Sequence, residues 1–206
     1  MLVFLYDQQV ISAISRKEEM TDETCLITEQ EREMIEQTLY DKGHFWRIDK
    51  YTVGCSGKQP TENHKWNDEK HYWEIDGELV KQNLGQKRAE LWEIIKQKRL
   101  DATRTGVEVT LADGRVRHFH TDQVARQEYD GMGVTIVLGA FEERQWKTIE
   151  NDWITLTLDN FKLLVNAIKN KIDHDYRNAE ILKAQINKSE KPETVDLNQG
   201  WSISYV

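Results

Sequence analysis

Two histidines and a carboxylate stand close together in the stretch His118-Phe119-His120-Thr121-Asp122. If this stretch is a β-strand, His118 and His120 lie on one face, and Asp122 could supply the third ligand of a catalytic zinc site. The alternative is structural: His120 hydrogen-bonds locally, and Thr121 or Asp122 caps the helix that follows. We favour the structural alternative and expect neither a metal ion nor another cofactor.

No other arrangement of residues predicts catalysis. Ser56 lacks the Gly-x-Ser-x-Gly context of an activated nucleophile. The glycines of Gly131-Met132-Gly133 are not followed by the further glycine and the lysine of a phosphate-binding loop. Carboxylates are abundant, but an acid and base pair must converge in a cleft, which a sequence alone does not reveal. We therefore expect that the protein is not an enzyme.

The aromatic residues suggest protein binding instead. The chain has 7 tryptophans, more than a compact core of this size needs, so we expect some of them to anchor another protein. The expected contact residues are Trp66, Tyr72, Trp73, Trp201, Ile203 and Tyr205. Trp146 and Trp153 are expected to be structural.

Composition limits the possible settings and partners. With 206 residues, 38% hydrophobic and 31% charged, the chain is predicted to be globular, as one large domain or two small ones. It has no apolar run long enough for a membrane span, so no membrane is expected as a partner. Residues 1–82 hold 10 Lys and Arg against 17 Asp and Glu, which disfavours nucleic acid. Cys25 and Cys55 are expected to be free thiols.

Residues 1–82 are predicted to form a small domain of mixed α and β structure. It opens with a strand, which has no basic flank and is not expected to be a signal peptide. A helix follows a Thr28-Glu31 capping box and ends where Gly43 takes the left-handed conformation. Residues 44–53 alternate as a strand, residues 54–64 form a loop, and residues 65–79 form an aromatic hairpin.

A connecting helix over residues 83–104 leads into a module over residues 105–187. Asp113-Gly114 predicts a hairpin with a two-residue type I′ turn. In that register Val109 faces His118, so one face is apolar except for two histidines. Gly131, Gly133 and the β-branched residues 134–137 disfavour a helix, and the conformation of residues 131–145 is left open.

The end of the module is predicted to be a second hairpin and a long helix capped by Thr157. The helical stripe consists of Phe161, Leu164, Val165, Ile168, Ile172, Tyr176, Ala179, Leu182 and Ile186. Residues 188–206 are predicted to be a linker and a strand-like tail. The tail would add to a sheet edge of its own chain, of a partner or of a second copy, giving a homo-oligomer through the tail or the long helix. The alternative is a frayed tail. The fold class expected for the whole chain is α+β.

The order of parts over residues 86–186 resembles DUF4376, a domain of unassigned function in proteins encoded among the tail-fibre genes of tailed bacteriophages. The resemblance preserves the tetrapeptide Phe119-His120-Thr121-Asp122 and leaves out His118. The layout of residues 1–82, with the Trp66/Trp73 hairpin, is similar to the small domain of tail-fibre assembly proteins.

The resemblance implies a chaperone-like phage tail-fibre assembly protein that binds a fibre protein in the host cytoplasm. The fibre or another tail protein would be the partner. The alternative is a permanent subunit of the virion, in the baseplate or the fibre tip. A small metal-dependent enzyme is the third possibility.

Overall fold

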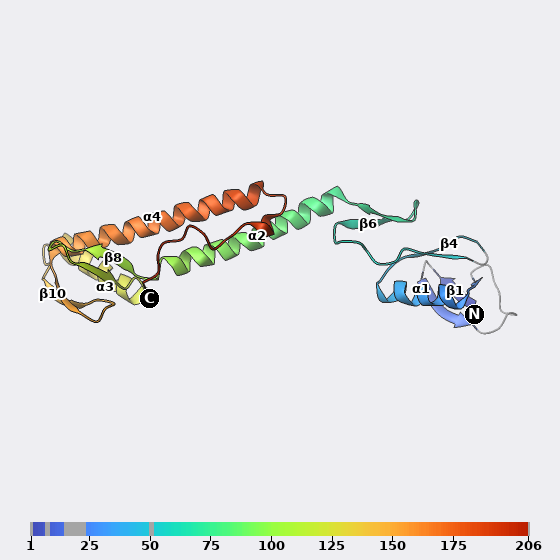
Figure 1. Ribbon diagram of the computed structural model, residues 1–206, viewed down its shortest axis with the longest axis horizontal. Helices are drawn as coiled ribbons and strands as arrows, with labels where there is room; N and C mark the ends of the chain where they lie inside the picture. The colour runs from blue at the N-terminus through green and yellow to red at the C-terminus, as the bar shows by residue number, and fades with distance from the viewer. Residues whose placement is uncertain (1, 7–8, 15–23, 50–51, 206) are drawn as a thin grey trace. The chain divides into compact units, whose positions relative to one another are not determined.

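The computed structural model describes residues 2–6, 9–14, 24–49 and 52–205 (Figure 1). It confirms the α+β class, with helices and small antiparallel hairpins and a long final helix. The chain divides into two compact units, Met1–Asn83 and Leu84–Val206. Helix α2 (Gly77–Ala102) begins in the first unit and continues in the second. No helix in the described part of the chain has the length and apolar character to cross a membrane.

The first unit contains a three-stranded antiparallel sheet, a helix and two hairpins. The sheet has the order β2-β1-β3 and consists of β1 (Leu2–Tyr6), β2 (Gln9–Ile14) and β3 (Thr24–Leu26). Helix α1 (Glu29–Tyr40) follows, and the hairpins are β4 (Phe45–Arg47) with β5 (Val53–Cys55) and β6 (His64–Asn67) with β7 (Tyr72–Ile75). Its buried core is made of Cys25, Ile27, Ile35, Phe45 and Val53.

The capping box of α1 is confirmed, but its C-terminal end differs from the prediction. Thr28 N donates to Glu31 Oε2 over 2.7 Å, and Glu31 N donates to Thr28 Oγ1 over 3.3 Å. Lys42, with φ of 55°, takes the left-handed conformation that was expected at Gly43. Instead, Gly43 lies so close to Gly57 O and to the Thr38 side chain that a Cβ atom would collide with both.

The strand predicted over residues 44–53 is wrong in extent. It is two short strands, β4 and β5, and residues 50 and 51 lie outside the described residues. The aromatic hairpin is present, and Trp66 and Trp73 are directly opposite each other with ring centroids 5.4 Å apart. His44 stacks on Trp66 at 4.9 Å. These rings therefore bury each other across the two hairpins.

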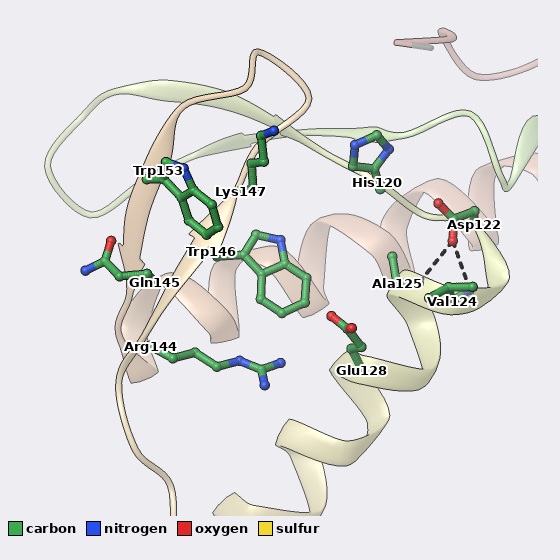
Figure 2. Close-up of a pocket in the computed structure, with 10 residues that line it drawn as sticks. All are labelled: His120, Asp122, Val124, Ala125, Glu128, Arg144, Gln145, Trp146, Lys147 and Trp153. Carbon is green, nitrogen blue, oxygen red and sulfur yellow. Dashed lines mark hydrogen bonds between the residues drawn. The ribbon is translucent and has the colours of Figure 1, made fainter.

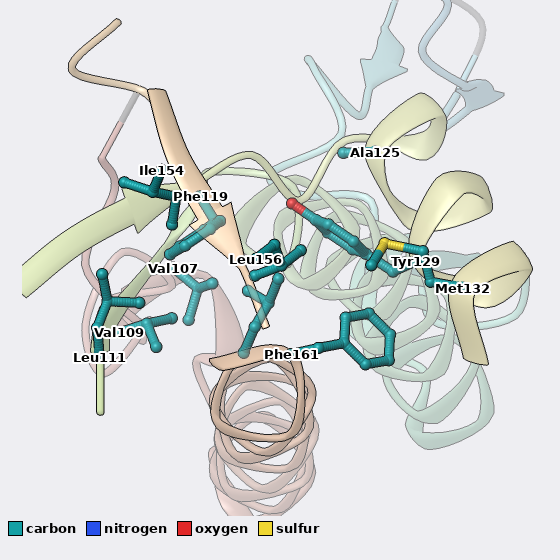
Figure 3. Packing of buried hydrophobic residues seen from close by; sticks show 11 residues of the cluster. Val107, Val109, Leu111, Phe119, Ala125, Tyr129, Met132, Ile154, Leu156 and Phe161 are labelled. Atoms are coloured by element: carbon teal, nitrogen blue, oxygen red, sulfur yellow. The ribbon is translucent and has the colours of Figure 1, made fainter. Parts of the chain in front are cut away.

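The second unit packs two hairpins and helix α3 on the beginning of a 31-residue helix. Its elements after α2 are β8 (Val107–Thr110), β9 (Val116–Phe119), α3 (Gln123–Val137), β10 (Arg144–Lys147), β11 (Trp153–Leu156), α4 (Leu158–Lys188) and the 3-10 turn η2 (Pro192–Thr194). Figure 3 shows the main core, which includes Val107, Val109, Leu111, Phe119, Tyr129, Met132, Ile154, Leu156, Phe161 and Leu164.

The turn of the first hairpin in this unit differs from the predicted type I′ turn. Leu111 N donates to Arg115 O over 2.8 Å and Gly114 N donates to Leu111 O over 2.9 Å, so the loop has three residues, 112–114. Gly114, with φ of 86°, completes a type I turn followed by a left-handed residue. The register is therefore shifted by one residue, and His118 lies opposite Glu108 instead of Val109. A one-residue shift exchanges the faces of a strand, so Phe119 enters the core and His118 leaves it.

Helix α3 extends through the stretch that was expected to disfavour a helix. It runs from Gln123 to Val137 and includes both Gly131 and Gly133. Tyr129 and Met132 on this helix are buried in the main core. Each glycine destabilises the helix by about 1 kcal/mol relative to alanine. Tertiary packing of α3 therefore outweighs this cost.

Helices α2 and α4 pack antiparallel, and the chain after α4 lies along them (Figure 1). Their contact is a second core made of Leu91, Ile95, Ala179, Leu182 and Ile186, against which Trp92, Val195, Leu197 and Trp201 pack. Helix α2 begins before the predicted residue 83 because Asp76 Oδ1 accepts from Glu78 N at 2.8 Å and Leu79 N at 3.2 Å. Thr157 caps α4 as predicted, accepting from Asn160 N at 3.3 Å.

Candidate functional site

His118 forms hydrogen bonds with two carboxylates. Its Nδ1 lies 2.6 Å from Glu150 Oε1, and its Nε2 lies 3.3 Å from Glu108 Oε2. Partial burial opposes ionisation of Glu150, but hydrogen bonds from the His118 side chain and from backbone groups lower its pKa to about 2. The ring of Tyr205 lies against the His118 ring, with the centroids 4.4 Å apart. His118 thus links the two hairpins to the end of the chain.

Residues 119–122 fix the position of the N-terminal end of α3. Thr121 is buried, and its Oγ1 donates to Thr103 O and accepts from Gly106 N, both at 2.9 Å. Asp122 caps the helix, because its Oδ1 accepts from the backbone N–H groups of residues 124 and 125. The carbonyl of His120 accepts from the Tyr129 hydroxyl at 3.0 Å, whereas the His120 ring is exposed. Among the described residues, no three His, Cys, Asp or Glu side chains are arranged to hold a metal ion.

The residues predicted to contact a partner differ in exposure. Trp66 is buried and Trp73 is half-buried, whereas Tyr72 is exposed. In the tail, Trp201 is half-buried and its Nε1 donates to Leu197 O over 2.9 Å, while Ile203 is exposed. The structure therefore buries the Trp66 indole, covers part of the Trp73 indole and leaves the Tyr72 ring accessible.

The tail returns to its own unit without forming the expected strand. Residues 201–205 have no strand pairing, but Tyr205 N donates to Thr105 O over 2.7 Å. Asp175, fully buried on α4, accepts from Ser202 N at 2.9 Å and from Ser202 Oγ at 2.8 Å. Lys171, also buried on α4, donates from Nζ to Ile203 O over 2.8 Å. We call this contact between residues 200–205 and α4 the tail seam.

One side of α3 borders a pocket with polar and aromatic walls, which we call the polar pocket (Figure 2). Its volume is about 440 Å³. It is lined by His120, Asp122, Val124, Ala125, Glu128, Arg144, Gln145, Trp146, Lys147 and Trp153. Trp146 packs on Tyr129 at 5.0 Å, and the Arg144 guanidinium lies 4.8 Å from the Trp146 ring centroid. Trp153, expected to be structural, is 66% exposed.

The other side of α3 forms an apolar groove with α4. We call it the α3–α4 groove, and its volume is about 570 Å³. It is lined by Arg126, Tyr129, Asp130, Gly133, Val134, Val137, Leu138, Phe161, Val165, Ile168 and Ile172. Val137 is 86% exposed and Leu138 is 73% exposed. This groove was not predicted, because the conformation of residues 131–145 was left open. A helix there places residues 130, 133, 134 and 137 on one face.

Comparison with known proteins agrees with the resemblance of the C-terminal part. A family model described as a domain of unknown function (DUF4376) matches residues 86–199, which is more than half of the chain. No curated protein and no solved structure matches the chain. The matched residues include both the polar pocket and the α3–α4 groove. The chain therefore belongs to the DUF4376 family.

Proposed function

We propose that the protein is a chaperone-like assembly factor, not an enzyme, and that it binds an apolar segment of a bacteriophage tail-fibre protein in the α3–α4 groove. The observation that supports this most is the exposure of Val134, Val137 and Leu138 side by side on the groove. Aliphatic side chains gathered in one exposed groove are typical of a protein-binding surface. The tail-fibre partner is inferred from the resemblance of residues 1–82 and 86–186 to proteins encoded with tail fibres.

The shape of the groove suits a helical or extended segment of the partner. It runs between two helices, α3 and α4, and its floor includes Phe161 and Ile168. An amphipathic segment that lays its apolar side chains in such a groove buries them without opening the core. Arg126 and Asp130 line the same groove and offer one charge of each sign to polar groups of the partner. In this proposal the bound segment is apolar surface of the unassembled fibre chain, which trimerisation later covers.

The test is co-purification with a bacteriophage tail-fibre protein. Val137→Lys places a charge in the groove, and we expect it to weaken binding at least about tenfold, which is about 1.4 kcal/mol. Its unfolding midpoint should be unchanged, because Val137 is 86% exposed. The matched control is Ile181→Lys, on an exposed residue of α4 that does not line the groove.

Two results would count against the proposal. Equal fibre binding by Val137→Lys and the wild type would exclude the groove as the binding surface. Stoichiometric amounts of the protein in purified virions would favour the alternative, a permanent tail or fibre-tip subunit. Absence from virions together with a higher yield of trimeric fibre on co-expression is the result that we expect.

A further inference from the structure

We propose that the polar pocket binds a saccharide of one or two sugar rings, with Trp153 and Trp146 as the aromatic part of its wall. This site is separate from the α3–α4 groove. On α3, residues 124, 125 and 128 line the pocket, whereas residues 126, 130, 133 and 137 line the groove. At about 100° per residue these two sets lie on opposite sides of the helix. A ligand in the pocket therefore leaves the groove accessible.

The two tryptophans present different parts of an aromatic wall. Trp153 is directly opposite Lys147 in the β10–β11 hairpin, and most of its indole is exposed. Trp146 is half-buried, with the Tyr129 ring 5.0 Å and the Arg144 guanidinium 4.8 Å from its ring centroid. Both tryptophans line the pocket, and the register places their side chains on opposite faces of the β10–β11 hairpin. The C–H groups on one face of a pyranose pack well on an indole, whose face carries partial negative charge.

The polar side chains around this wall have unused hydrogen-bonding capacity. Within the described part of the chain, the side chains of Arg144, Lys147, Glu128 and His120 form no ion pair and no hydrogen bond with other residues. Gln145 Nε2 donates to Thr155 Oγ1 over 3.0 Å, which leaves its amide oxygen as an acceptor. The pocket thus offers both donors and acceptors. Sugar hydroxyls, which both donate and accept, match such a set.

The charges of the pocket balance and so favour a neutral ligand. The two cations Arg144 and Lys147 are opposed by the two carboxylates Asp122 and Glu128. Asp122 uses Oδ1 to cap α3, which leaves Oδ2 for a ligand. A phosphate or another polyanion would meet two carboxylates as well as two cations. A neutral polyhydroxyl ligand can use all four charged groups as hydrogen-bond partners.

The size of the pocket also fits a small polar ligand better than a protein segment. Its volume of about 440 Å³ lies in the range of about 300–1,000 Å³ of small-molecule sites. An apolar protein side chain placed there would bury Arg144, Lys147 and Glu128 without partners, which is unfavourable. A saccharide would instead give each of them a hydroxyl group. The pocket is thus suited to saccharide binding, and Trp153 is its exposed edge.

The experiment titrates the full-length protein with named sugars. The probes are glucose, galactose, mannose, N-acetylglucosamine, lactose and maltose, followed by saturation-transfer NMR and by tryptophan fluorescence. We expect at least one of them to bind saturably with a Kd of about 1–10 mM, a free energy of about −3 to −4 kcal/mol. Inorganic phosphate, tested in the same way, should not compete.

Substitutions of Trp153 test whether the sugar binds in the polar pocket. Trp153→Ala should weaken sugar binding at least about tenfold without changing the unfolding midpoint, because the side chain is 66% exposed. Trp153→Phe should retain most of the binding, since it keeps an aromatic face. The matched control is Tyr176→Ala, which removes an exposed aromatic ring of the same unit away from the pocket and should bind like the wild type.

Several results would overturn the inference: no saturable response to any of the six sugars, a response unaffected by Trp153→Ala, or competition by inorganic phosphate. Loss of fibre binding in Trp153→Ala, without any sugar response, would assign the exposed indole to a protein partner instead. The groove variant Val137→Lys should bind sugar normally. Failure of the sugar site and failure of the proposed fibre-binding groove can therefore be told apart.

Discussion

The main core and the tail seam of the second unit are stabilised in different ways, although α4 contributes to both. Near its start, α4 supplies Phe161 and Leu164 to an apolar core. Near its middle it supplies Lys171 and Asp175, which are also buried but are polar. Apolar packing is non-directional, so many side chains fill the core acceptably. A buried charge needs particular partners, and here residues 202 and 203 supply them.

The comparison indicates why the tail is ordered without being a strand. Burial lowers the pKa of Lys171 because its charge is partly removed from water, and the nearby Asp175 opposes that shift. Without the tail, the Asp175 carboxylate would lose both of its hydrogen bonds from Ser202. The tail therefore completes α4, and the second unit is expected to be less stable without it. Four changes test this difference.

The largest effect is expected in the main core. Leu156 is fully buried, and Leu156→Ala should lower the free energy of unfolding by about 2–5 kcal/mol because it leaves a cavity. Urea denaturation followed by circular dichroism measures it. The matched control, Leu163→Ala on the exposed side of α4, should change the stability by less than about 1 kcal/mol. Equal losses for the two variants would mean that Leu156 is not in a packed core.

A smaller loss is expected in the tail seam. Asp175→Ala should lower the free energy of unfolding by about 1–3 kcal/mol, because Ser202 loses its acceptors and Lys171 loses a nearby opposite charge. The decisive measurement is a double-mutant cycle with a chain that ends at residue 199. If the seam exists, Asp175→Ala should have a clearly smaller effect in the shortened chain. Strictly additive losses would show that Asp175 and the tail act independently.

The corrected turn of the β8–β9 hairpin gives the next effect. Gly114→Val should lower the free energy of unfolding by about 1–2 kcal/mol, because a β-branched residue is strained at positive φ. Nothing lies within 4 Å of a Cβ atom at this position, so the loss would come from strain alone. Gly114→Asn should be milder, since asparagine tolerates the left-handed region. An unchanged midpoint for the valine variant would exclude this turn.

The smallest effect is expected at Glu150. This residue hydrogen-bonds His118, whose ring packs on Tyr205 of the tail. The pKa of Glu150 is lowered from 4.5 to about 2 in the folded protein. The ionised carboxylate therefore stabilises the fold above about pH 4.5, and this contribution is lost as the pH falls towards 2. Glu150→Gln should lower the free energy of unfolding at pH 7 by about 0.5–1 kcal/mol, a small value because Glu150 is partly exposed.

The pH dependence distinguishes this effect from a general loss of packing. The difference between Glu150→Gln and the wild type should shrink between pH 4.5 and about pH 2. The control is Glu143→Gln, which changes an exposed carboxylate and should leave the stability unchanged at both ends of this range. A difference that stays constant with pH would show that the charge of Glu150 does not stabilise the fold.

Local signals in the sequence predicted many of the elements. Thr28 and Thr157 cap their helices as expected, because a capping side chain acts within one turn of its own position. Asp113-Gly114 marked a real hairpin, but its loop length was wrong. A two-residue turn and a three-residue loop both accept Asp-Gly, and the register is set by which backbone groups hydrogen-bond across the strands.

The sites were less predictable than the elements. The polar pocket joins β10, β11 and the start of α3, and the α3–α4 groove joins helices that are separate in the sequence. The aromatic residues were recognised as important, but the most exposed tryptophan, Trp153, was expected to be structural. Exposure depends on the neighbours that the fold brings to a side chain, and residue types and their local spacing do not indicate which neighbours those are.

Helix α4 shows which features follow from residue spacing and which depend on neighbours in the folded chain. Its apolar periodicity determined that it is helical and that Leu164, Leu182 and Ile186 face inward. The same periodicity placed Val165 and Tyr176 inside, whereas both are exposed. The positions buried in their place belong to Lys171 and Asp175, because the tail brings hydrogen-bond partners to them. Hydrophobic burial follows from residue type and spacing, but burial of a charge depends on a partner that only the folded chain supplies.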